Sequence, residues 1–151
     1  MAFVPENARW YLADVVIEHK IEDEPRNVVH INTLLVRANS PERAHKRALQ
    51  LGKNAEHEYQ NSDDKTVRVL FRGLRDLCVI YELLRSGSEI IYSERVGLSE
   101  EETFKLVSPK EELGVFEDRG KPSKNDPNYM PENILEALHN AGLNDEDMFS
   151  D

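Results

Sequence analysis

The chain has 151 residues, a single cysteine and a formal net charge of -10. A chain of this length fits one domain with a substantial core, and one cysteine excludes an internal disulfide. The single cysteine, and an amino terminus without a basic start and a long apolar run, predict a cytoplasmic protein. No apolar run approaches the roughly 18 residues that a membrane-spanning helix needs, so we expect no membrane partner.

The negative charge is concentrated near the C-terminal end. Residues 111–151 carry 11 acidic and 3 basic side chains, a net charge of -8, whereas residues 1–110 carry 18 and 16, a net charge of -2. A body near neutrality lacks the concentrated positive potential that binds a phosphate backbone, so we expect no nucleic-acid partner. The acidic end either serves solubility alone or meets a basic protein partner.

Two extended segments begin the chain. Apolar side chains alternate along residues 9–20 and again along residues 28–37, which is typical of β-strands. The link between them, residues 21–26, is too short for a crossover connection. The sequence therefore predicts an antiparallel hairpin.

A helical pattern follows over residues 41–51 and begins with a proline. The Ser40 hydroxyl is suited to accept a hydrogen bond from a free amide of the first turn, and proline in the first helical position loses no hydrogen bond. Ala44 and Ala48 lie on one stripe, which lets the helix approach a sheet closely. Gly52 predicts the end of the helix, because glycine readily adopts the left-handed conformation of a C-terminal cap.

Three more extended segments are predicted at residues 66–72, 77–82 and 89–96. Gly73 separates the first two, and a Ser-Gly-Ser sequence at residues 86–88 separates the last two. Both links are short, which favours an antiparallel meander. Beyond them, Ser99 and three acidic residues predict a short helix that runs towards Val107.

Together these elements predict an α+β fold. We expect an antiparallel sheet of about five strands, in the order β-β-α-β-β-β, with the main helix packed on one face. Residues 1–116 are expected to form this single domain. The composition of residues 117–131 predicts a flexible linker. Residues 132–151 are predicted to form an acidic tail with a short amphipathic helix.

The sheet face opposite the helix keeps several apolar side chains, namely Trp10, Leu12, Val16 and Leu70. Full exposure of these side chains in water would leave an unusually large apolar patch. We therefore expect a homodimer, or a later segment of the chain that covers this face.

Several motifs carry a family likeness: residues 10–13 (WYLA), 27–30 (NVVH), 34–42 (LLVRANSPE), 71–77 (FRGLRDL) and 109–113 (PKEEL). Over residues 9–116 the chain resembles an uncharacterised bacterial domain-of-unknown-function family, number four-two-eight-eight. The resemblance implies a small bacterial cytoplasmic protein. It assigns no activity, cofactor or substrate, and therefore no functional residues.

One polar constellation is predicted from the alternation of side chains along the strands. If the strands are neighbours, one sheet face gathers Asp14, Glu18, His30, Asn32, Arg68 and Arg72. Such a face can orient an anionic or polar ligand, and His30 is its only group that titrates near neutral pH. The alternative is an exposed face with ordinary cross-strand pairs.

Arg75 belongs to a second candidate, the turn at residues 72–76, whose glycine can aim backbone amides at a phosphate or carboxylate. The alternative is a tight turn with an ion pair between Arg75 and Asp76. Cys78 lies in an apolar run, so we expect its side chain to pack in the core rather than to act as a nucleophile. The histidines lack the paired spacing of a metal site, so no metal and no cofactor are expected.

No catalytic set stands out, so the leading hypothesis is a non-enzymatic binding or interaction module. Its partner would be another protein or a second copy of the chain. The alternative hypothesis is a small-ligand-binding protein or a small enzyme that uses His30, Asp14, Arg68 and Arg72. General acid–base chemistry requires such groups to converge within hydrogen-bond reach.

Overall fold

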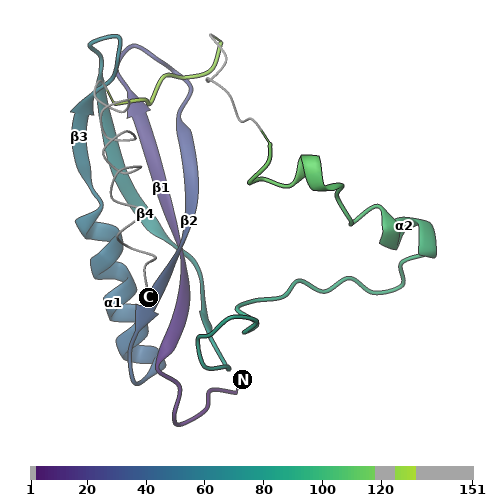
Figure 1. Ribbon diagram of the computed structural model, residues 1–151. Coiled ribbons are helices and arrows are strands. Elements are labelled where there is room, and N and C mark those ends of the chain that lie inside the picture. Colours follow the sequence, from purple (N-terminus) through teal and green to yellow (C-terminus); the bar gives the residue numbers. More distant parts are fainter. Residues whose placement is uncertain (1–2, 118–124, 132–151) are drawn as a thin grey trace, which may run out of the picture.

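The computed structural model describes residues 3–117 and 125–131. One face of a four-stranded antiparallel sheet carries a long helix (Figure 1). The strands lie in the order β2-β1-β4-β3. In chain order the elements are β1 (Trp10–Ile21), β2 (Val28–Arg37), α1 (Pro41–Asn54), β3 (His57–Gln60), β4 (Thr66–Val79), α2 (Glu100–Phe104) and a 3-10 helix (Lys110–Glu112). The α+β class, the antiparallel sheet and the main helix are confirmed.

The predicted hairpin of β1 and β2 is present, and β1 lies at the centre of the sheet. Tyr11, Ala13, Val15 and Ile17 alternate along β1 and are all buried in the core. Alternate residues of a strand point to the same face, so this row faces α1. The core is therefore built between the odd-numbered side of β1 and the alanine stripe of α1.

Helix α1 begins as predicted, because the Ser40 Oγ accepts a hydrogen bond from the Arg43 amide at 3.2 Å. Ala44 and Ala48 are completely buried against the sheet. The predicted end at Gly52 was wrong, since the helix continues to Asn54. Gly52 is buried, and a Cβ atom there would lie 2.6 Å from two carbon atoms of the Phe71 ring. The glycine permits close contact between the helix and the sheet.

The expectation of five strands was also wrong. Strand β4 runs without a break from the first predicted segment into the second and ends at Val79, and Gly73 lies inside it with φ of +139° instead of forming a turn. Two register shifts against β1 leave Arg72 and Arg75 as extra residues on β4, as in β-bulges. A glycine in a strand can mark a bulge as well as a turn, and here the bulge occurs. The short strand β3 was not predicted.

Residues 89–96, the expected fifth strand, do not join the sheet. After Ile80 the chain leaves the sheet as a long segment, residues 81–117, which we call the arm and which projects away from the sheet (Figure 1). The short helix predicted in the arm is present as α2, where the Ser99 Oγ accepts from the Glu102 amide at 3.1 Å.

Residues 125–131, part of the predicted linker, are hydrogen-bonded to the end of the sheet. The buried Asn61 side chain donates to the Asn128 carbonyl at 2.9 Å, and the Ser62 amide donates to the Met130 carbonyl at 3.2 Å. The Tyr59 hydroxyl donates to the carbonyl of Tyr129. The helix predicted within residues 132–151 lies outside the described residues.

Candidate functional site

The predicted polar constellation is divided between the two faces of the sheet. His30 pairs with Ile17, and Asn32 pairs with Val15, so both lie on the face that carries α1. Asp14, Glu18, Arg68 and Arg72 lie on the opposite face, which we call the open face. The hairpin register pairs odd-numbered residues of β1 with even-numbered residues of β2. The assumption that even-numbered residues of both strands share a face was therefore wrong.

On the open face, Glu18 is held by two neighbours. Its carboxylate accepts from Asn27 Nδ2 at 2.6 Å and from Arg72 Nε at 2.8 Å. The Asn27 hydrogen bond, followed by the Arg72 hydrogen bond, lowers the pKa of Glu18 below its ordinary value. The bulge aims Arg72 at Glu18, which fits the usual effect of an extra residue on side-chain direction.

Asp14 and Arg68, two other predicted residues of the open face, also form cross-strand contacts. Asp14 accepts from the Thr33 hydroxyl at 2.7 Å. Arg68 Nε lies 3.4 Å from a carboxylate oxygen of Glu58, and Arg75 is exposed at the other bulge. These contacts are the ordinary cross-strand pairs that stabilise a sheet face.

A cluster of imidazole and phenol rings lies on the sheet face that carries α1, beyond the end of that helix. The ring centroids of His19 and His30 are 4.7 Å apart, and Tyr129 lies 5.5 Å and 5.1 Å from them. Burial, followed by the charge of His30, lowers the pKa of His19. Sequence reasoning missed this cluster, because only the register of the hairpin and the return of residues 125–131 bring the rings together.

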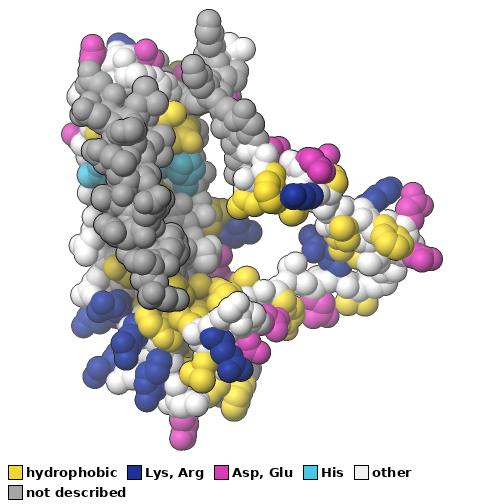
Figure 2. Space-filling model, in the orientation of Figure 1, with side chains coloured by type: hydrophobic (Ala, Val, Ile, Leu, Met, Phe, Trp, Pro, Cys, Tyr) yellow, Lys and Arg dark blue, Asp and Glu magenta, His cyan; other side chains and the backbone are white. Residues whose placement is uncertain are grey.

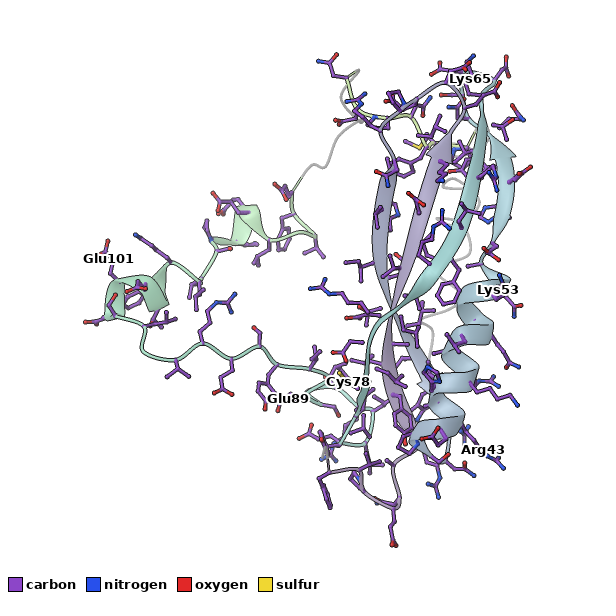
Figure 3. All side chains as sticks on the ribbon, turned by 180° about the vertical axis from the view of Figure 1, so that it is seen from behind. Arg43, Lys53, Lys65, Cys78, Glu89 and Glu101 are labelled. Carbon is purple, nitrogen blue, oxygen red and sulfur yellow. The ribbon has the colours of Figure 1, made fainter. Side chains whose placement is uncertain are left out.

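A basic groove of about 540 Å³ lies between the end of β2 and α1. Its cations are Arg9, Arg37, Arg43, Lys46 and Arg47. None of them forms an ion pair with a carboxylate among the described residues. Figure 2 shows Lys and Arg side chains gathered over the lower part of α1, and Figure 3 labels Arg43 at that end of the helix. The groove concentrates positive charge in an acidic protein.

An apolar pocket of about 680 Å³ lies where the sheet meets the start of the arm. Figure 3 shows Cys78 and Glu89 at this junction, and both line the pocket together with Tyr11. Burial and a hydrogen bond to Asp76 raise the pKa of the Cys78 thiol to about 11. A protonated thiol is a poor nucleophile, so this environment does not activate Cys78 for covalent chemistry.

Among the residues that the structure describes, the arm carries the largest set of exposed apolar side chains, visible along it in Figure 2. Thirteen large hydrophobic residues in it are between 39% and 87% exposed. They are Tyr81, Leu83, Leu84, Ile90, Ile91, Tyr92, Val96, Phe104, Leu106, Val107, Leu113, Val115 and Phe116. So many exposed apolar side chains in one segment are typical of an interaction surface.

Within residues 3–117 and 125–131, no three or more His, Cys, Asp or Glu side chains are arranged to hold a metal ion. The helices in the same residues are too short and too polar to cross a membrane.

One family model matches residues 10–93, which is more than half of the chain. The matched span begins with β1 and ends inside the arm, so it joins the sheet, α1 and the start of the arm in one unit. Comparison with curated proteins found no match, and comparison with solved structures found none either. The match confirms the family resemblance over residues 10–93, and the chain belongs to the family Domain of unknown function (DUF4288).

Proposed function

We propose that this protein is a non-enzymatic interaction module that binds a protein partner through the arm. The observation that carries the proposal is the exposure of thirteen large apolar side chains over residues 81–117. Large exposed apolar surfaces on soluble proteins mark interaction sites. Bacterial origin and cytoplasmic location stay predictions of the sequence.

The size of the exposed surface supports an obligatory or tightly bound partner. The exposed fractions of the arm side chains add up to about eight whole residues. Burial of one large apolar side chain stabilises a complex by ~1.5–3 kcal/mol. Even if half of this surface is buried, the gain is on the order of 10 kcal/mol before the cost of association is subtracted.

The polar residues support binding rather than catalysis. Glu18 and Arg72 satisfy each other, and the Cys78 thiol is protonated near neutral pH. The alternative hypothesis needs His30 to meet Asp14 or Arg68, but they lie on opposite faces of the sheet. Groups on opposite faces cannot share a proton within hydrogen-bond reach.

The experiment compares two variants as baits in a pull-down from an extract of the source cells. Ile91→Ser with Phe104→Ser removes apolar surface from the arm without touching the core, since both residues are exposed. Leu49→Ser is the matched control, because Leu49 is an exposed apolar residue of α1. We expect the arm variant to lose the partner and the control to keep it. Equal recovery by both baits contradicts the proposal.

A second candidate function is the binding of a small apolar ligand in the pocket beside Cys78. It is favoured by the Tyr11 hydroxyl, which is buried and has no hydrogen-bond partner among the described residues. Tyr11 lines this pocket, and a small number of polar groups in an apolar pocket is typical of ligand sites. Thermal-shift screening of wild type and Tyr11→Phe checks it, and a hit that raises both melting temperatures equally argues against a role for the hydroxyl.

A further inference from the structure

Resting on the proposed function, we infer that the partner of the arm is a second copy of this chain. In this dimer, the arm of each copy lies along β2 of the other. The dimer is symmetric, so each copy both gives an arm and receives one. The inference rests on three observations. Within the described residues no further strand pairs with the outer edge of β2, and the strand-like segment of the arm pairs with no strand of the sheet. The charges of the two surfaces are the third observation.

Strand β2 is the receiving surface because it is a long outer strand of the sheet. Its open-face side chains Val29, Ile31 and Leu35 are 49%, 45% and 51% exposed. Natural proteins protect such edges with charges, prolines or a covering segment. Strand β2 has no proline and, apart from His30, its only ionisable side chain is Arg37 at its end. The other outer strand, β3, has only four residues.

Residues 89–96 of the arm are the inserted segment. Their sequence is rich in Ile, Tyr and Val and predicts a strand, yet they join no strand of the sheet in the described structure. A strand needs a neighbour to satisfy its backbone groups, and an added strand on a free edge is a common mode of recognition. The family match ends at Ser93 and therefore includes part of this segment with the sheet.

The charges favour contact between an arm and a body rather than between two arms. Residues 81–117 carry nine acidic and four basic side chains, a net charge of -5. Two such arms repel each other, whereas the basic groove adjoins the end of β2 and holds five cations without ion pairs among the described residues. Opposite charges on the two surfaces guide the arm towards the body of the other copy.

The test measures molar mass by light scattering at micromolar concentration, with melting temperature and circular dichroism as controls for folding. The monomer mass is 17.4 kDa. We expect twice this mass for wild type and for Leu49→Lys, which changes an exposed residue of α1. The arm variant Ile91→Asp and the edge variant Ile31→Lys are each expected to be folded monomers.

Mixing the two variants decides which surfaces meet. The arm of Ile31→Lys is intact and so is β2 of Ile91→Asp, so the mixture keeps one of the two contacts and is expected to regain a dimer. A mixture that stays monomeric overturns the inference, as does an arm variant that remains dimeric. If wild type is monomeric but its arm is still needed in the pull-down, the inference fails and the proposed function stands. If the arm is irrelevant in both experiments, both fail.

Discussion

Replacement of Gly52 by alanine tests the contact between α1 and the sheet. In an exposed helix interior this change stabilises a protein by about 1 kcal/mol, because alanine has the higher helix propensity. Here φ of Gly52 is not left-handed, so no backbone strain opposes alanine. The Phe71 ring does oppose it, since two of its carbon atoms would lie 2.6 Å from the new Cβ.

Carbon atoms in favourable contact are about 3.5–4.0 Å apart, so the helix or the ring must move by about 1 Å. Overpacking of this kind costs roughly 1–3 kcal/mol. After the gain in helix propensity is subtracted, we expect Gly52→Ala to lower the free energy of unfolding by about 1–2 kcal/mol. In a domain of this size the melting temperature then falls by roughly 2–8 °C.

The assay is urea denaturation followed by circular dichroism, for Gly52→Ala in wild type and in a Phe71→Leu background. Leucine lacks the ring atoms that approach Gly52, so there the alanine is expected to be neutral or stabilising. A left-handed helix cap at Gly52 would instead make alanine equally costly in both backgrounds. Equal costs, or a stabilised single variant, refute the proposed contact.

Three further predictions concern ionisable groups. The pKa of Glu18 is lowered in the folded state, so its stabilising effect is present above the ordinary value of 4.5 and lost as pH falls below it. The urea midpoints of wild type and Glu18→Gln should therefore become more similar as the pH is lowered. A difference between the two midpoints that stays constant with pH would contradict this prediction. The pKa of His19 is also lowered, so wild type should lose stability as pH falls below 6.5, and His19→Gln should lose less. If the stability of His19→Gln depends on pH in the same way as that of wild type, His19 is not the cause of the loss. The pKa of Cys78 is about 11 in the folded protein, so its thiol should react slowly with iodoacetamide at pH 8. We expect the alkylation rate of the folded protein, measured by mass spectrometry, to be at least ~10-fold lower than that of the protein unfolded in urea.

The candidate sites were harder to predict than the fold. The strand pattern placed Glu18 and Arg72 on one face correctly, and they form an ion pair at 2.7 Å. The same reasoning failed for His30, because one residue of register decides which face a side chain occupies. The cluster joins His19 and His30 of the hairpin to Tyr129, which is far along the chain, so no local sequence pattern predicts it.

The sequence by itself determined the α+β class, the hairpin of β1 and β2, and the start of α1 at its Ser40 cap. Each of these depends on neighbouring residues, through periodicity, a short link or a hydrogen bond within one turn. The tertiary structure alone decided the unbroken path of β4 through Gly73, the continuation of α1 past Gly52 and the departure of the arm from the sheet. The physical reason is that a glycine permits a turn, a bulge or a close approach equally well. Only the surface packed against it selects one of these.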